Sequence, residues 1–150
     1  MRYSLRPLWE VATLATGKSC CVLWEPKLDG LNWLGRANTI HPVRGRWTIE
    51  LNPVKLCGAD GLPNDDFASV FWHESYHILQ GHPMAMAPVT GLTMEPIDVW
   101  IKRAAAGSLR TTHDADNPVG NRYERDANLF ASMAAERWPT SWLLRQMLVP

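Results

Sequence analysis

The chain has 150 residues, of which 46% are hydrophobic and 20% are charged. Fifteen basic and fifteen acidic side chains cancel to a formal net charge of zero, which removes the bulk attraction to phosphates that nucleic-acid binders show. We therefore expect no direct contact with nucleic acid, and a chain of this length and composition is expected to fold as one domain spanning residues 1–150.

The N-terminal stretch and the cysteines both indicate a cytoplasmic protein. Pro7, Glu10 and several threonines interrupt the segment that a secretion signal would fill with apolar residues, and no apolar run approaches the length of a membrane span. Cys20, Cys21 and Cys57 form an odd set without CxxC spacing, so we expect buried thiols rather than disulfides or metal ligands. We expect no membrane partner, and the sequence does not indicate an oligomeric state.

The first part of the chain predicts a helix followed by a small sheet. Apolar residues at helical spacing predict a helix over residues 7–16, which Gly17 would end. Strands are predicted over residues 20–24 and 46–51, because the first is a short β-prone run and the second alternates polar and apolar residues. A further strand is predicted over residues 31–40.

Four helices are predicted after the sheet. A loop over residues 56–66, rich in Gly, Pro, Asn and Asp, supplies capping residues for the first of them, and Thr140 or Ser141 would cap the last. The predicted helices cover approximately residues 67–80, 96–106, 118–138 and 140–148. The predicted fold class is α+β, with a small mixed or antiparallel sheet packed on a helical bundle.

The helix predicted over residues 67–80 contains a metal-binding pattern. Its residues His73-Glu74-Ser75-Tyr76-His77 match the pattern His-Glu-x-x-His. Two histidines four positions apart stand one above the other on a helix, so both imidazoles reach one ion at the roughly 2.0 to 2.1 Å that zinc requires. Glu74 is placed to act as the general base toward a water that the metal activates, rather than to bind the metal itself.

A catalytic zinc ion usually has three protein ligands, so a third residue must come from outside this motif. His82 is out of register with the familiar downstream ligand position and lies beside the signals that end the helix. Glu124 is the preferred candidate, because it flanks the buried stripe of the helix over residues 118–138 and so can face the histidines. Asp126 is the rival ligand, and Asn128, one turn after Glu124, would orient a histidine ring through a hydrogen bond.

Four side chains are candidates to stabilise a developing oxyanion, since each carries a hydrogen-bond donor. They are Tyr76, His82, His113 and Tyr123. The sequence does not distinguish among them.

The order of these segments resembles that of the ImmA/IrrE family of zinc metallopeptidases. The opening helix, the strand ending in residues 49–52 (Ile-Glu-Leu-Asn), the zinc-motif helix and residues 124–131 (Glu-Arg-Asp-Ala-Asn-Leu-Phe-Ala) occur in the family's order. Ser75 and Tyr76 depart from the usual Leu-Gly within the zinc motif. The resemblance implies a minimal gluzincin-like α+β domain.

The same resemblance implies that His73, His77 and Glu124 bind zinc and that Glu74 is the catalytic base. Family members are implicated in cleaving repressor-type DNA-binding proteins, and many are encoded by phages and mobile elements. We therefore expect hydrolysis of a peptide bond in a cytoplasmic protein, such as a phage or mobile-element repressor. The alternative is a non-catalytic zinc-binding module for protein–protein interaction, which an intact Glu74 argues against because a structural site needs no base.

Overall fold

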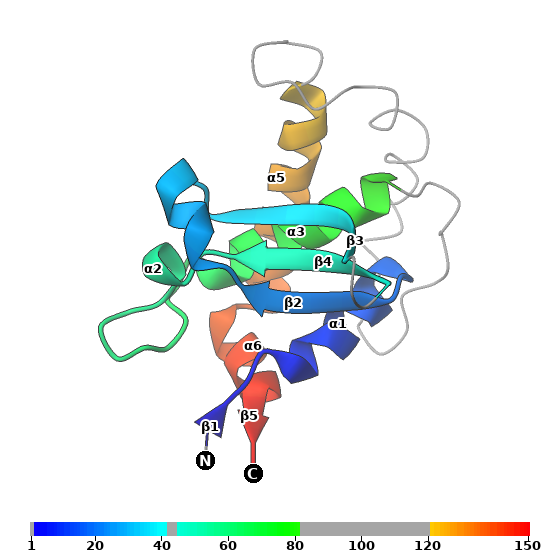
Figure 1. The fold of residues 1–150 in the computed structure, drawn as a ribbon. Helices are drawn as coiled ribbons and strands as arrows, with labels where there is room; N and C mark the ends of the chain where they lie inside the picture. The colour runs from blue at the N-terminus through cyan, green and yellow to red at the C-terminus, as the bar shows by residue number, and fades with distance from the viewer. Residues whose placement is uncertain (1, 42–44, 82–120) are drawn as a thin grey trace.

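Residues 2–41, 45–81 and 121–150 are described by the computed structural model (Figure 1). Its helices are α1 (Arg6–Thr16), α2 (Pro53–Leu56), α3 (Phe67–Gly81), α5 (Asn121–Arg137) and α6 (Thr140–Met147), with one 3-10 helix, η1 (Pro26–Leu31). Its strands are β1 (Arg2–Tyr3), β2 (Cys20–Trp24), β3 (Gly35–His41), β4 (Arg46–Leu51) and β5 (Leu148–Val149). The helix predicted near residues 96–106 lies outside the described residues.

A three-stranded mixed sheet forms one layer of the fold. β4 lies in its centre, parallel to β2 and antiparallel to β3, with Cys20 opposite Trp47 and Gly35 opposite Leu51. A two-residue pairing of β1 with β5 joins the two ends of the chain. Within the described ranges, β3 is therefore an edge strand, and the predicted α+β class is confirmed.

α3 packs between the sheet and α5 (Figure 1). Toward the sheet, the ring centroid of Phe67 lies 5.6 Å from that of Trp24 in β2. Toward α5, Tyr76 stacks on Phe130 at 4.9 Å, and Trp72 meets the same ring edge-on at 6.5 Å. Phe67, Trp72, Tyr76 and Phe130 are all fully buried, so both sides of α3 are fixed in a close-packed core.

α1 ends where the sequence predicts. Gly17 adopts the left-handed conformation, with φ 71°, and its N–H donates a hydrogen bond to the Thr13 carbonyl. Glycine adopts this conformation at no steric cost because it has no Cβ atom. The indole N–H of Trp9 donates to the Val22 carbonyl at 2.9 Å, which joins α1 to β2.

Two sequence expectations, on membrane spans and on the cysteines, concern the described residues. None of their helices combines the length and the apolar content needed to cross a membrane. All three cysteines are free thiols; Cys20 and Cys21 are buried, as predicted, whereas Cys57 is only half-buried.

The strand predicted over residues 31–40 begins later than expected, at Gly35. Leu31 closes η1, and Asn32 adopts a left-handed conformation with φ 57°, so extended pairing starts only at Gly35. Neither η1 nor α2 is predicted from the sequence, because each is too short to show helical periodicity.

The predicted cap of α6 is wrong. The residue that precedes α6 is Pro139, and no side chain caps the helix. The hydroxyl oxygen of Thr140 instead accepts a hydrogen bond from the backbone N–H of Ala68, in the first turn of α3, at 3.1 Å. Thr140 therefore stabilises the start of α3 rather than the start of its own helix.

Candidate metal centre

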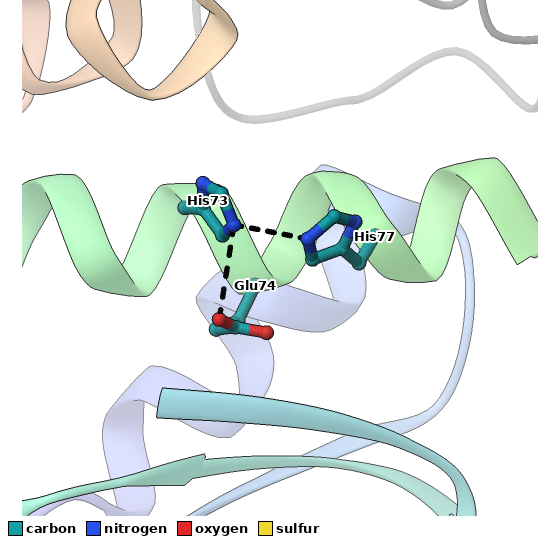
Figure 2. A group of neighbouring side chains, drawn as sticks. All are labelled: His73, Glu74 and His77. Atoms are coloured by element: carbon teal, nitrogen blue, oxygen red, sulfur yellow. Dashed lines mark hydrogen bonds and ion pairs between the residues drawn. The ribbon is translucent and has the colours of Figure 1, made fainter. Parts of the chain in front are cut away.

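α3 places the two histidines of the motif side by side (Figure 2). The Nε2 atoms of His73 and His77 are 2.9 Å apart, and their rings meet edge to face with centroids 4.5 Å apart. This contact follows from the spacing, because four residues advance the chain by slightly more than one helical turn. Both side chains are half-buried. The pair of imidazole nitrogens therefore lies at the boundary between the hydrophobic core and the solvent.

Glu74 turns from the histidine pair toward the sheet (Figure 2). The residue is 7% exposed, and its Oε1 lies 4.0 Å from His73 Nε2. Its Cγ atom faces Gly35 at the start of β3. The Glu74 side chain is thus held between α3 and the edge strand, close to the imidazole nitrogens.

The side chains of these three residues could hold a metal ion. His73, Glu74 and His77 offer ligand atoms that all lie within 4.8 Å of one another. Imidazole nitrogen is a preferred zinc ligand, and tetrahedral ligands at the usual bond length are about 3.3 Å apart. The two Nε2 atoms are 2.9 Å apart, so a small rotation of the rings would bring them to the separation of two tetrahedral ligands of one ion.

The third ligand predicted from the sequence belongs to α5. Glu124 and Asp126 lie within the described backbone of α5, but their side chains are outside the described residues. Ala127 and Phe130 are buried, and Phe130 stacks on Tyr76 of α3. The assignment of Glu124 or Asp126 stays a prediction.

The other predicted site residues are only partly within the described ranges. Tyr76 is fully buried and stacked on an aromatic ring of α5, which favours a packing role. His82, His113 and the side chain of Tyr123 lie outside the described residues. Asn128 is exposed on α5, and its hydrogen bond to a histidine ring stays a prediction.

Gly35 is a residue of the site that the sequence pattern does not predict. Its backbone lies so close to α3 that the side chains of Val70 and Glu74 occupy the space a Cβ atom would need. A glycine at a strand position is a known sign of close approach by another segment. That sign is present in the sequence, but it does not reveal which segment approaches.

An ion pair fixes the edge strand beside this contact. Arg36 in β3 donates from Nη2 to Glu50 Oε2 at 2.9 Å and from Nε to Oε1 at 3.3 Å. The hydrogen bond to Glu50 raises the pKa of the Arg36 guanidinium, although partial burial acts in the opposite direction. Arg36 and Glu50 are cross-strand partners, so the pair ties β3 to β4 next to Gly35.

Comparison with known proteins gives no relative for this chain: no family model, curated protein or solved structure matches it. The resemblance to the ImmA/IrrE family therefore depends on the sequence motifs alone. The assignment of a function depends on those motifs and on the geometry of α3.

Proposed function

We propose that this protein is a zinc-dependent metallopeptidase in which His73 and His77 bind the metal ion and Glu74 is the general base. One observation carries the proposal: two Nε2 atoms are in contact on α3, with a buried carboxylate 4.0 Å from one of them. Glu124 of α5 is the proposed third ligand. Three protein ligands would leave one position of a tetrahedral ion for water or substrate.

Glu74 has the chemistry that hydrolysis requires. A bound zinc ion would supply a Lewis acid that polarises the peptide carbonyl and makes water more acidic. The Glu74 carboxylate accepts a proton from the attacking water, whose oxygen forms a bond to the carbonyl carbon. The C–N bond then breaks, and Glu74 gives the proton to the leaving nitrogen. One water molecule is thereby added across one peptide bond.

The edge strand β3 offers a place for an extended peptide. Among residues 2–41, 45–81 and 121–150, no strand pairs with its outer edge. The N–H and C=O groups of an edge strand can pair with an additional chain. Because Gly35 of β3 lies against Glu74, a peptide bound along this edge would lie beside the proposed base.

The proposed substrate is a cytoplasmic protein, and the sequence resemblance favours a repressor encoded by a phage or mobile element. The alternative is a non-catalytic zinc-binding module for protein–protein interaction. Glu74 favours hydrolysis over this alternative, because a structural zinc site is closed by four ligands and has no use for a buried carboxylate that serves as a base.

Two measurements test the proposal: the zinc content of the purified protein and the hydrolysis of fluorescein-labelled casein. Glu74→Gln is expected to keep zinc and to lower kcat by about 10²–10⁴-fold, because it removes the base and leaves the ligands. His77→Ala is expected to lose zinc. Glu136→Gln, at an exposed position of α5, is the matched control and should change neither quantity. Full activity of Glu74→Gln would rule out the mechanism.

The same measurements identify the third ligand. Glu124→Ala is expected to lower the zinc content, whereas Asp126→Ala is expected to leave it unchanged. The reverse result would assign the ligand to Asp126. Full zinc content in both variants would show that α5 does not supply the ligand at either position.

A further inference from the structure

A cluster of exposed apolar side chains precedes the edge strand β3. Leu31, Trp33 and Leu34 are 53%, 48% and 45% exposed. In the described part of the chain seven large hydrophobic side chains are exposed in all, so three of the seven fall within four consecutive positions. Residues 31–34 are named the apolar segment.

The backbone of the apolar segment is held in place although its side chains are exposed. The N–H of Trp33 donates to the Leu28 carbonyl at 3.1 Å. The Trp33 carbonyl accepts a hydrogen bond from the side-chain amide of Asn52 at 2.9 Å, and the Leu34 carbonyl accepts one from the Asn52 N–H at 2.9 Å. Asn52 is fully buried, so it fixes the apolar segment from the inside of the fold.

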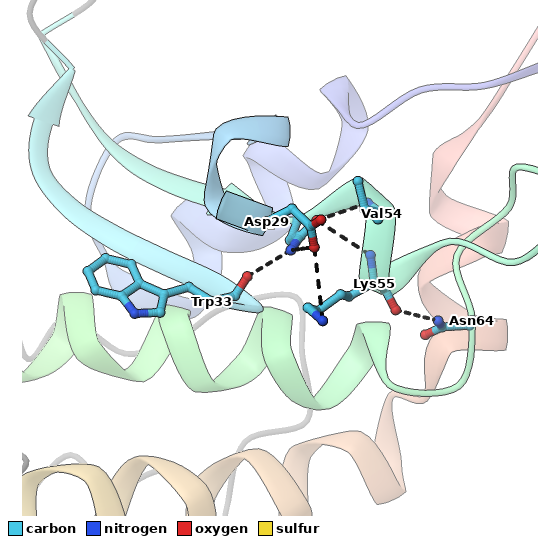
Figure 3. A network of polar contacts seen from close by, with 6 residues as sticks. Asp29, Trp33, Val54, Lys55 and Asn64 are labelled. Atoms are coloured by element: carbon cyan, nitrogen blue, oxygen red, sulfur yellow. Dashed lines mark hydrogen bonds and ion pairs between the residues drawn. The ribbon is translucent and has the colours of Figure 1, made fainter. Parts of the chain in front are cut away.

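Asn52 also forms hydrogen bonds with two other segments, α2 and η1. Its Oδ1 accepts hydrogen bonds from the N–H groups of Val54 and Lys55 at the start of α2, and its amide also donates to Asp29 Oδ1 at 3.2 Å. Figure 3 shows this network, with the indole ring of Trp33 pointing away from it. A backbone fixed in this way loses little conformational freedom when a partner covers the exposed side chains.

The apolar segment leads directly into the candidate site. Leu34 is followed by Gly35, which lies against Glu74. Paired strands advance together by about 3.3 Å per residue. A peptide that pairs with the outer edge of β3 and reaches Glu74 would therefore meet the apolar segment within a few residues of the bond that is cleaved.

We infer that the apolar segment determines substrate specificity by binding bulky apolar side chains of an extended peptide near its scissile bond. The inference rests on the proposed peptidase function, because it assigns the segment to the same substrate. An indole ring and leucine side chains gain free energy by burying apolar surface against a partner. A peptide with charged side chains at these positions would lose hydration without that gain.

Peptide binding tests the inference separately from catalysis. The probes are fluorescein-labelled Gly-Ser peptides whose two central residues are Leu-Phe or Glu-Glu, and binding to zinc-loaded Glu74→Gln protein is followed by fluorescence anisotropy. The Leu-Phe peptide is expected to bind about tenfold more tightly than the Glu-Glu peptide. Adding Trp33→Ala should remove this preference without weakening the binding of the Glu-Glu peptide. Adding Trp33→Phe instead should retain most of the preference.

Val54→Ala is the matched control, because Val54 is 61% exposed but lies on α2, outside the apolar segment. The preference of the Val54→Ala variant for the Leu-Phe peptide should equal that of the parent protein. If Trp33→Ala lowers the melting temperature, Leu31→Ala makes the same test at another exposed position.

Each outcome separates this inference from the proposed function. Casein hydrolysis without any preference that depends on Trp33 would overturn the specificity role and leave the peptidase proposal standing. The wild-type protein could instead hydrolyse no casein while the preference for the Leu-Phe peptide still depends on Trp33. That result would support peptide binding by the apolar segment and count against the peptidase function. Equal binding of both peptides overturns the inference whatever the activity.

Discussion

Gly35 of β3 lies against Glu74 of α3: a Cβ atom on Gly35 would be 3.1 Å from Cγ of Glu74 and 2.9 Å from Cγ1 of Val70. The absence of a side chain at this position sets how closely α3 approaches the edge strand. The position of the proposed base therefore depends on a residue that lies outside the zinc motif.

Gly35→Ala is expected to displace Glu74 and Val70. We expect a loss of about 1–3 kcal/mol in the free energy of unfolding, as is usual for overpacking, and a decrease in kcat of about tenfold or more from misplacement of the base. Zinc content should be unchanged, because the added atom meets Glu74 and Val70 rather than a histidine. Urea unfolding, metal analysis and casein hydrolysis measure the three quantities.

Gly30→Ala is the matched control for this prediction. A Cβ atom on Gly30 would meet nothing within 4 Å, so its stability and activity should stay close to those of the parent protein. Wild-type stability and turnover in Gly35→Ala would show that the edge strand does not position the base.

Zinc is expected to stabilise the folded protein. An ion that binds only the folded state at 100 times its dissociation constant adds about 2.7 kcal/mol, which raises the melting temperature of a chain of this size by about 5–10 °C. Thermal unfolding of chelator-treated protein, with and without added zinc, measures the shift. His77→Ala should show almost none of it, and an equal shift in that variant would place the ion somewhere else.

The elements with a periodic pattern and a clear stop signal are predictable from this sequence. The predicted strands over residues 20–24 and 46–51 coincide with β2 and β4, and the predicted helix over 67–80 matches α3 to within one residue. η1 is tied to the rest of the fold by contacts between distant residues, such as the hydrogen bond from the Asn52 amide to Asp29, 23 positions earlier in the chain. No local pattern reveals such contacts.

The same distinction between local patterns and long-range contacts applies to the residues of the site. His73, Glu74 and His77 are predictable as a group because they lie within one helix, where spacing alone determines geometry. Gly35 is not predictable as their neighbour, since it reaches Glu74 only through the packing of α3 on the sheet. Thr140 shows how a local rule fails: its hydroxyl bonds to a residue 72 positions away instead of capping its own helix.

The Cys20 thiol in β2 is expected to be unreactive in the folded protein. Burial raises its pKa to about 11, and the hydrogen bond with Thr16 offsets only part of this effect. The thiolate is the reactive form, so at pH 8, well below this pKa, Cys20 is almost entirely protonated as well as inaccessible. Iodoacetamide at pH 8 should therefore modify the half-buried Cys57 first, although burial also raises the pKa of Cys57.

Mass spectrometry of proteolytic peptides locates the modified cysteines. Protein unfolded in urea is the control, and all three cysteines should then react at similar rates. Modification of Cys20 as fast as Cys57 in the folded protein would contradict the burial of β2.

Thr140 connects α6 to the first turn of α3. Its hydroxyl oxygen accepts the hydrogen bond of the Ala68 N–H, and both residues are buried. Thr140→Val keeps the shape of the side chain but leaves that N–H without its acceptor, so we expect a loss of about 1–2 kcal/mol in the free energy of unfolding. Ser141→Ala, at the exposed neighbouring position, should change it by less than about 0.5 kcal/mol. Equal losses in the two variants would contradict the role of the Thr140 hydroxyl at the start of α3.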